Sequence, residues 1–540
     1  MHLSLLFALA CCPFAFSASS SIVSTSYGKL LGTKSEYRKD VSVFKGIPFA
    51  APPTGDLRFR APEGPTSWKG VRNATVFGPQ CYQPNSGSSI FTTGSSEMSE
   101  DCLYANVWVP PNTTSHDKLP VYLYMYGGRY YMGSGDVSTY DGSGLAEKGV
   151  IVVTFNYRLG LLGFFAHPEL SAESGHNSSG NYGLLDAVAA LKWVHEEIAA
   201  FGGDPERITV GGQSAGSCQA LSMMYSPLTD DLGLAGVIAE TGARSVRDPM
   251  MGGASTSYRE KVAAETYGET FLKEQNLTSI SALRNASASD LVQYGYTNDD
   301  TYENTQFANL SAFMDPPEWR PVLDGYVLKY SYGESLRKNA HQDVPILTGN
   351  NADESGASVS PGYTVESYDT DFADMFGNIS SEAFALYPAN TSAAADKQSN
   401  AIFRDLNRIG TSDWGNDYTA GVAKSNVFTY FWTWPAPTIT DGGAYHGSEL
   451  YYAFASIPFA DTSANWTSTD YKIMDTMSSY WANFIKNGDP NGDGLAEWPA
   501  NSAKNATTMW LGTHFRAGML AEANSKIQFF KKWFSFQPEW

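Results

Sequence analysis

The stretch Gly-Gly-Gln-Ser-Ala-Gly-Ser at positions 211–217 decides the expected fold, because it places a serine at a sharp turn. Residues 207–210 before it are apolar and β-branched enough for a short buried strand, and residues 215–224 suit a helix. Gly212 and Gly216 flank the serine where such a turn leaves no room for a Cβ. This arrangement is a nucleophile elbow, which exposes the hydroxyl of Ser214 on a strained backbone. The motif alone is weak evidence, so Ser214 also needs a base, an acid and an oxyanion hole.

Short β-rich runs alternate with helical patterns along the rest of the chain, which is typical of an α/β sheet protein. The sequence predicts a helix from 183 to about 200, and strands at 43–50, 119–126, 150–157, 237–239 and 344–347. We expect the segments 250–340 and 355–425, helical and polar by turns, to be insertions that form the pocket walls. Without internal repeats or long linkers, one domain over 19–540 is the simplest partition. The predicted fold class is α/β, with a doubly wound, mostly parallel central sheet.

The chain is strongly acidic, and its N-terminus is apolar. The chain carries 36 Lys and Arg against 56 Asp and Glu, a net charge of −20, which argues against nucleic acid or an anionic membrane as a partner. Residues 3–16 form an apolar run too short to span a bilayer, and small residues follow it. This pattern predicts a signal peptide over 1–18 and a secreted, extracellular protein. Only His2 stands where a basic residue is usual, so a buried N-terminal segment stays the alternative.

Two further sequence patterns fit a secretory route. Asn-x-Ser/Thr sequons occur at Asn73, Asn112, Asn177, Asn276, Asn285, Asn309, Asn378, Asn390, Asn465 and Asn505, and we expect some of them to be chance matches. Cys11 and Cys12 would leave with the signal peptide, and Cys81 and Cys102 stand in polar surroundings suited to a disulfide. Cys218 is then expected as a buried apolar side chain, with a reactive thiol as the lesser alternative. No later apolar run reaches membrane-spanning length, so no stable membrane anchor is expected.

Ordered strings along nearly the whole mature chain carry a family resemblance. They are Lys-Gly-Ile-Pro-Phe-Ala at 45–50, Glu-Asp-Cys-Leu-Tyr at 100–104, Asn-Tyr-Arg-Leu-Gly at 156–160, Gly-Asn-Tyr-Gly-Leu-Leu-Asp at 180–186 and Phe-Gly-Gly-Asp-Pro at 201–205. With these strings the chain resembles the type-B carboxylesterase/lipase family of α/β-hydrolases, as a secreted fungal-type esterase. The resemblance implies an α/β-hydrolase fold, hydrolysis of carboxylic esters by a serine, and pairing of Cys81 with Cys102. No cofactor and no metal are expected.

The resemblance also implies the partners of Ser214. A serine hydroxyl needs a neutral imidazole to accept its proton, and the imidazole needs an anion to orient it. The chain order in this fold is serine, acid, histidine, which puts the base at His446 in a Gly-flanked loop and the acid at Glu354. Asp353 is the adjacent competitor for the acid, and solvation without a role is the alternative for any loop carboxylate. Thr241 takes a position that serine usually holds in the family.

The oxyanion hole is expected from the backbone N–H groups of Gly128, Arg129 and Ala215, with Gly127 opening the Gly-rich loop. Arg129 stands where most relatives have a third glycine. Its side chain either turns away into a salt bridge or enters the pocket and favours substrates with a carboxylate or a polar oxygen. The family commonly has glutamate before the nucleophile, whereas this chain has Gln213, which removes a negative charge from the pocket.

The substrate is expected to be a small, soluble ester of short-to-medium or aromatic type. The 20 residues between Cys81 and Cys102 contain no tryptophan and little apolar periodicity, which favours neither an interfacial lid nor an aromatic platform for a cationic ligand. Aromatic residues at 130–131 and 428–434 either line a pocket or belong to the core. The alternatives are a non-catalytic binding or adhesion protein on the same fold, an interfacial lipase, and an amidase that uses the same triad. The oligomeric state stays open.

Overall fold

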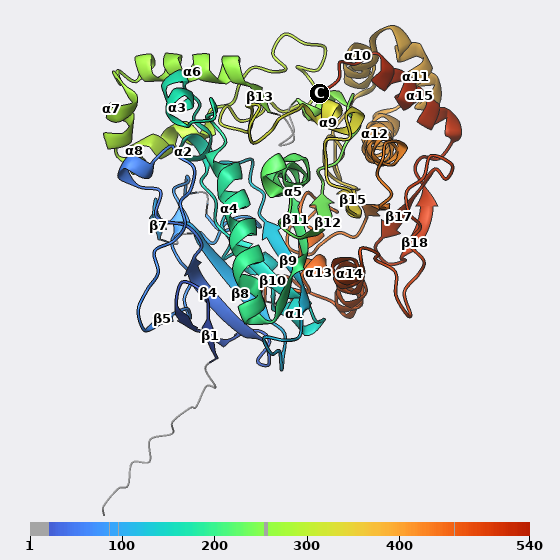
Figure 1. Cartoon of the computed structure of the whole chain (residues 1–540). Helices are drawn as coiled ribbons and strands as arrows, with labels where there is room; N and C mark the ends of the chain where they lie inside the picture. The colour runs from blue at the N-terminus through green and yellow to red at the C-terminus, as the bar shows by residue number, and fades with distance from the viewer. Residues whose placement is uncertain (1–20, 86, 95–96, 253–257, 458) are drawn as a thin grey trace, which may run out of the picture.

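The computed structural model describes residues 21–85, 87–94, 97–252, 258–457 and 459–540. The predicted signal peptide lies outside these described residues. Eleven strands of the described chain form one large sheet (Figure 1). Their order is β18 (Arg516–Met519), β17 (Thr507–Leu511), β16 (Val427–Trp432), β15 (Ile346–Asn351), β12 (Leu234–Glu240), β11 (Gly203–Gln213), β9 (Leu119–Met125), β10 (Ile151–Phe155), β8 (Tyr104–Val109), β4 (Ser42–Pro48) and β3 (Thr33–Lys34).

The seven strands from β17 to β10 along this order pair in parallel, and antiparallel strands complete both edges of the sheet. The central strands read as continuous apolar runs because both of their faces are covered. The remaining strands form small sheets: β1 (Ile22–Ser24), β2 (Lys29–Leu31) and β5 (Val71–Asn73); β6 (Gln80–Cys81) and β7 (Met98–Ser99); β13 (Arg259–Glu260) and β14 (Val322–Leu323).

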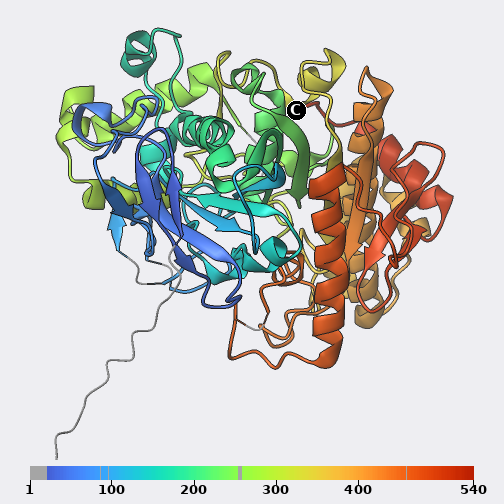
Figure 2. The same ribbon diagram turned by 60° about the horizontal axis from the view of Figure 1, so that its bottom comes forward.

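Helices cover both faces of the large sheet: α4, α5 and α12 pack on one face, and α1 and α14 on the other (Figures 1 and 2). The α-helices are α1 (Ser143–Glu147), α2 (Gly160–Phe164), α3 (Pro168–Glu173), α4 (Tyr182–Glu197), α5 (Ala215–Tyr225), α6 (Lys261–Glu274), α7 (Ile280–Asn285), α8 (Ala288–Leu291), α9 (Tyr332–Arg337), α10 (Val365–Phe376), α11 (Ser380–Leu386), α12 (Ser392–Ala420), α13 (Leu450–Ala453), α14 (Ser468–Asn487) and α15 (Asn524–Ser535). Short 3-10 helices are η1 (Gly55–Leu57), η2 (Ser138–Tyr140), η3 (Ile198–Phe201), η4 (Pro227–Thr229), η5 (Pro249–Met251), η6 (Val292–Tyr296) and η7 (Gly377–Ile379).

The predicted insertions lie above the carboxyl ends of the parallel strands. Figure 1 shows α6 to α8 at the upper left and α10, α11 and α15 at the upper right, while the β12 arrow points towards them. Binding sites of open α/β sheets lie outside the carboxyl ends of the strands. The insertions therefore stand where walls of a substrate pocket are needed.

Apolar side chains divide into two main clusters. The larger one follows the sheet and its covering helices. The second joins residues from the two insertions to the last helix, and its members include Phe307, Phe313, Phe372, Phe403 and Trp533. Residues 302–313 of the first insertion thus pack against the second insertion and α15, whereas α6 to α9 belong to the larger cluster.

The aromatic run near 430 belongs to the core. Residues 427–432 form β16, and every residue of this strand is buried between β15 and β17. For the strand itself the structure therefore favours the core alternative, because every one of its residues is buried. Tyr130 is also buried and packs on Phe164, whereas Tyr131 is only partly buried and contacts Tyr296.

The disulfide implied by the family resemblance is present. Cys81 and Cys102 form a disulfide, and Cys218 is buried on α5 outside it. None of the helices in the described part of the chain is long and apolar enough to cross a bilayer.

Candidate active site

Ser214 occupies the sharp turn between β11 and α5. Its backbone has φ 58° and ψ −126°, a conformation that residues with a Cβ rarely adopt. The flanking glycines are required by close backbone packing, because a Cβ on Gly212 would lie 2.4 Å from the carbonyl oxygen of Met125, and one on Gly216 only 1.9 Å from it. The turn thus holds Ser214 at the carboxyl end of the sheet, at the start of a helix.

His446 and Glu354 meet at the same end of the sheet. His446 Nδ1 lies 2.6 Å from Glu354 Oε2, although 92 residues separate the two in the sequence. Glu354 follows β15 and is itself held in place: its Oε1 accepts the backbone N–H of Asn351 at 2.7 Å and the hydroxyl of Thr241 at 3.2 Å. The carboxylate is buried, while the His446 side chain is 39% exposed, so the site opens to solvent at the histidine.

The surroundings of His446 tune its basicity. Burial alone would lower the pKa of His446, but the hydrogen bond and the charge of Glu354, together with the charge of Glu449, raise that pKa above its ordinary value. A histidine with an oriented Nδ1 and a raised pKa is suited to accept a proton at Nε2.

The side-chain amide of Gln213, the residue before the nucleophile, lies beside the base. Its Nε2 is 3.2 Å from His446 Nε2, and within the described chain no hydrogen bond joins that ring nitrogen to the Ser214 hydroxyl. Catalytic hydrogen bonds are often formed only when substrate is bound. Gln213 precedes Ser214 directly, so the geometry brings Ser214 and His446 into one site and places an amide beside the proton-accepting nitrogen.

The loop after β9 approaches the nucleophile from the other side. A Cβ on Gly127 would lie 3.0 Å from Ser214 Cβ and 2.7 Å from the Gln213 carbonyl oxygen, so only glycine fits there. Gly128 and Arg129 follow with φ 104° and 54°. Among the described residues, neither donates its backbone N–H to another backbone group. The N–H of Ala215 is at the first position of α5, where a helix leaves it without an internal partner. These three N–H groups are therefore available to an oxyanion.

The Arg129 side chain turns towards the first insertion. Its Nη2 donates to the Asp315 carbonyl oxygen at 2.6 Å and lies 3.4 Å from Asn298 Oδ1. The structure thus favours the alternative in which the side chain turns away. The contact differs from the expected salt bridge, because the acceptors are a backbone carbonyl and a side-chain amide.

Asp353 does not contact His446. One of its oxygens accepts the backbone N–H of Ala444 at 2.8 Å, and the other pairs with Arg404 at 2.6 Å. The adjacent competitor for the acid is thus held in a different network, and the carboxylate that touches the imidazole is Glu354.

A buried acidic network behind the histidine was not expected from the sequence. Glu449 accepts a hydrogen bond from the Asn351 side chain, and Glu240 accepts one from Trp481 Nε1 at 2.9 Å. Both carboxyls are fully buried, and burial raises the pKa of both, that of Glu449 to about 7. In the sequence, the signal for Glu449 was its position three residues after His446, which places it close to the base.

The disulfide-closed loop covers one side of the site. A Cβ on Gly127 would meet Phe91, and one on Gly447, next to the histidine, would meet Ile90. Gln83 fastens this loop, because its side chain donates to and accepts from the backbone of Gly133 at 2.8 Å each. A pattern-poor loop thus supplies two apolar side chains next to the reacting groups.

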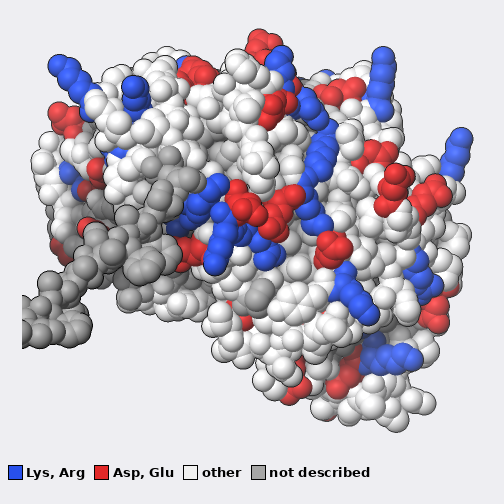
Figure 3. Space-filling view, turned by 90° about the horizontal axis from the view of Figure 1, so that it is seen from below, with Lys and Arg blue, Asp and Glu red and all other residues white. Residues whose placement is uncertain are grey.

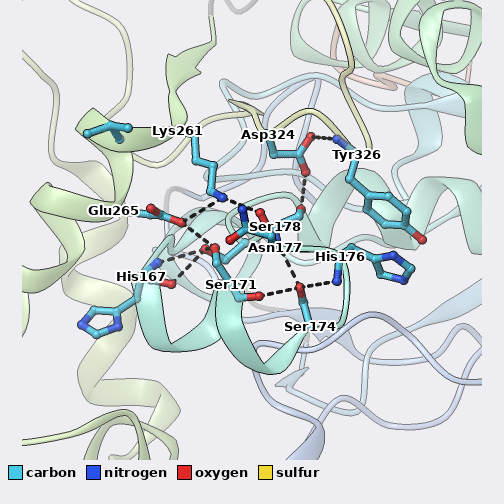
Figure 4. Close-up of polar contacts among 12 residues, drawn as sticks. His167, Ser171, Ser174, His176, Asn177, Ser178, Lys261, Glu265, Asp324 and Tyr326 are labelled. Carbon is cyan, nitrogen blue, oxygen red and sulfur yellow. Dashed lines mark hydrogen bonds and ion pairs between the residues drawn. The ribbon is translucent and has the colours of Figure 1, made fainter.

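A second cluster of serines and histidines lies near α3, remote in sequence from the elbow. Figure 4 shows that the rings of His167 and His176 point away from the centre of this cluster. The hydroxyls of Ser171 and Ser178 instead donate to the carboxylates of Glu265 and Asp324. The cluster fastens α3 and its following loop to the first insertion and shows no serine activated by a histidine. Within the described ranges, no group of three or more His, Cys, Asp or Glu side chains could hold a metal ion.

Comparisons with known proteins show the family of the chain. The family profile described as "Carboxylesterase family" matches residues 19–530. A fumonisin B1 esterase of Sphingopyxis macrogoltabida is 37% identical over 85% of this chain and 81% of its own length. A para-nitrobenzyl esterase of Bacillus subtilis (strain 168) is 33% identical over 91% of this chain and 94% of its own.

Solved structures show the same architecture. A structure of a PNB esterase superimposes with a TM-score of 0.75 and 30% identity, covering 94% of this chain and 99% of its own. The chain therefore has the α/β-hydrolase fold, belongs to the carboxylesterase family and is a carboxylic ester hydrolase.

Proposed function

We propose that the protein hydrolyses soluble carboxylic esters through an acyl-enzyme on Ser214. The observation that carries the proposal is the Glu354–His446 contact of 2.6 Å beside the strained serine turn. A buried carboxylate orients the imidazole so that Nε2 faces the neighbourhood of the nucleophile, which is the arrangement that serine activation requires.

Each step of the proposed mechanism uses a group described above. Ser214 Oγ attacks the ester carbonyl carbon while His446 Nε2 takes the hydroxyl proton, and the N–H groups of Gly128, Arg129 and Ala215 bind the oxyanion. The tetrahedral intermediate collapses as His446 gives the proton to the leaving alcohol. Water then attacks the acyl-enzyme with His446 again as base, and the carboxylic acid leaves. Glu354 stays ionised and stabilises the imidazolium.

The expected substrates are short-to-medium or aromatic esters in solution. Ile90 and Phe91 provide a small apolar wall, and the loop that carries them is fastened to Gly133 by Gln83. A fastened loop of this kind does not need a lipid interface to open, so we infer that activity shows no jump at an emulsion surface. A jump in rate on emulsified long-chain esters would favour the lipase alternative.

The Ser214→Ala variant tests the mechanism. Removing the nucleophile is expected to lower the rate of hydrolysis of a short-chain p-nitrophenyl ester at least about 10³-fold, because no acyl-enzyme can form. The matched control is Ser222→Ala on the same helix, whose hydroxyl donates to the Cys218 carbonyl and which should keep full activity. Unchanged hydrolysis by the Ser214 variant contradicts the proposal.

A serine-directed organophosphonate separates the enzyme from a non-catalytic binding protein on the same fold. We expect stoichiometric labelling of the wild type and none of the Ser214→Ala variant. No labelling of the wild type would favour the binding or adhesion alternative.

The amidase alternative uses the same residues, so the rates of hydrolysis of matched amides and esters decide it. We expect the ester to react faster because its alkoxide is the better leaving group.

We also propose that the protein is secreted and carries N-linked glycans. The apolar run at 3–16 is of signal-peptide length, and the Cys81–Cys102 disulfide suits an oxidising compartment. All ten sequon asparagines are exposed. Many other asparagines, such as Asn106, Asn156 and Asn181, are buried, so exposure is not a general property of asparagine in this chain. The fungal-type origin and the single-domain partition stay predictions.

A further inference from the structure

The loop that carries the acid and the loop that carries the base are joined through one residue, Asp353. Its backbone N–H donates to the Ala444 carbonyl oxygen at 3.1 Å, and its carboxylate accepts the Ala444 N–H at 2.8 Å. Asp353 directly precedes Glu354, and Ala444 stands two residues before His446. Two hydrogen bonds of one residue therefore connect the backbones on which the acid and the base are mounted.

Arg404 of α12 holds Asp353 from outside the two loops. Its Nη2 lies 2.6 Å from Asp353 Oδ1, and its Nε donates to the Ala352 carbonyl oxygen at 2.7 Å. The guanidinium thus binds the acid loop at a side chain and at the backbone together. Such a fork has a fixed geometry and orients what it binds more strictly than a single charge does.

The packing around the link leaves little freedom. Gly443 has φ +65°, and a Cβ there would lie 2.3 Å from Asp353 Oδ2, so the base loop passes the carboxylate as closely as a glycine allows. On the buried side, the Asn351 side chain donates to the Tyr445 carbonyl oxygen at 2.7 Å and provides a second tie between the same two loops. The Asp353–Arg404 pair is the tie on the open side.

The open side is a cavity between α12, the β17–β18 hairpin and the start of α15. Asp353, Arg404, Phe431 and Trp510 belong to its lining, and its other charged groups are Asp405, Arg408, Arg516, Glu522 and Lys526. Asp405 pairs with Arg408 and Lys526, and Glu522 pairs with Lys526. In the described chain Asp353 is therefore the acidic partner of Arg404, and these neighbours do not replace it.

We propose that Asp353 is a positioning residue of the reaction, which together with Arg404 fixes the loop of Glu354 to the loop of His446. The inference rests on the proposed function, since it concerns the same triad. It gives a role to the carboxylate next to the acid: Asp353 touches no reacting atom and acts through the distance between Glu354 and His446. Errors of about 1 Å in such a distance cost up to about 10²-fold in rate.

Two variants, Asp353→Asn and Arg404→Gln, test the proposal by kinetics normalised to active sites counted by stoichiometric labelling with the serine-directed organophosphonate. We expect kcat to fall roughly 10-fold in both, with KM little changed, because substrate binding is not altered. Arg404→Lys, which keeps one charge but not the fork, should fall less. The matched control is Asp475→Asn, which breaks an exposed pair with Lys148 and should behave as wild type.

The pH profile of kcat/KM distinguishes positioning from charge. A looser contact with Glu354 lowers the pKa of His446, so the acid limb should move to lower pH in both variants. Both variants keep the groups that act on His446, which are Glu354, Glu449 and the amide of Gln213. Simple electrostatics would move the limb in opposite directions, because one variant removes a negative charge and the other a positive charge. Opposite shifts, or an unchanged kcat per active site, overturn the proposal. A wild type that the serine-directed organophosphonate does not label contradicts the proposed function instead.

Discussion

At the scale of single residues, the two departures from the family pattern differ in their consequences. Arg129 keeps its backbone in the oxyanion loop while its side chain binds Asp315. Gln213 stands nearer to the chemistry, since its amide lies beside His446 Nε2 and its Oε1 is buried without a partner in the described chain. Because the group at position 213 is neutral, the charges that raise the pKa of His446 are those of Glu354 and Glu449.

Gln213→Glu is expected to move the acid limb of the kcat/KM profile to higher pH, by roughly one unit. The reason is that a carboxylate beside Nε2 favours the protonated imidazole and raises the pKa of His446, and the base must be neutral to accept a proton. Gln213→Met is the control, since it has a similar length and no charge, and should leave the limb in place. An acid limb that stays fixed in Gln213→Glu would show that position 213 does not control the base.

The residues of the triad were predictable from the sequence, but the contacts that hold their loops in place were not. Ser214 lies in a short motif whose turn is imposed by neighbouring glycines, and chain order with family resemblance then led to Glu354 and His446. Asp353 and Asn351 contact Ala444 and Tyr445 across more than ninety residues of sequence. Such contacts depend on how two loops approach in space, and no local pattern encodes that approach.

At the scale of elements, strands and helices with strong periodicity were found where the sequence predicts them. The helix expected from 183 to about 200 is α4 followed by η3, and it ends at Gly202 with φ 88°, where a left-handed residue stops a helix. The strand expected at 207–210 is longer, because β11 pairs with both β9 and β12 up to Gln213. No strand was predicted for β3, β8, β16, β17 or β18 of the large sheet, and β18 is a short strand that is largely exposed.

Asp136 ties the disulfide-closed loop to the segment that follows the oxyanion loop. Its carboxylate accepts hydrogen bonds from Gln80 Nε2 at 3.1 Å and from the Thr93 hydroxyl at 3.4 Å. Burial raises the pKa of Asp136 to about 6, and these hydrogen bonds and Lys45 offset only part of the effect. The native state therefore holds this proton more tightly than the unfolded chain does.

Asp136→Asn should gain stability over the wild type as the pH rises from 4 to 7. The pKa of Asp136 in the folded protein lies above its unfolded value of 3.8, so this carboxyl contributes most to the stability of the wild type below pH 3.8. That contribution is lost as the pH rises through 6, by on the order of 2 kcal/mol. Urea midpoints measured at pH 4.5 and 7 check the expectation. Asp475→Asn, at an exposed site, serves as the control, and an equal difference at both pH values would contradict the assignment.

At the scale of the whole molecule, the surface carries charged side chains of both signs. The net charge is −20, yet basic and acidic side chains lie next to each other on the face opposite the site (Figure 3). The ten exposed sequon asparagines come from segments throughout the chain, from Asn73 at the end of β5 to Asn505 before β17. Glycans at these positions would cover the outside of the fold without entering the sheet.

Expression through a eukaryotic secretory pathway is expected to yield a chain whose mass falls on treatment with an N-glycosidase. Asn112→Gln should remove one glycan if its site is occupied, because Asn112 is exposed in a turn after β8. Asn304→Gln is the matched control, since Asn304 is equally exposed but lies outside any sequon. A secreted wild-type chain whose mass is unchanged by the enzyme would contradict the glycosylation proposal.

The second apolar cluster has a consequence for how such a protein can diversify. Residues 302–313, the helices α10 and α11, the first half of α12 and α15 bury side chains against one another, whereas α6 to α9 pack in the larger cluster with the sheet and its elbow. Changes in the sequence of the segments of the second cluster can be absorbed inside that cluster. An evolving lineage, or a laboratory library confined to these segments, can therefore reshape the entrance to the site while the strands that hold Ser214, Glu354 and His446 keep their register.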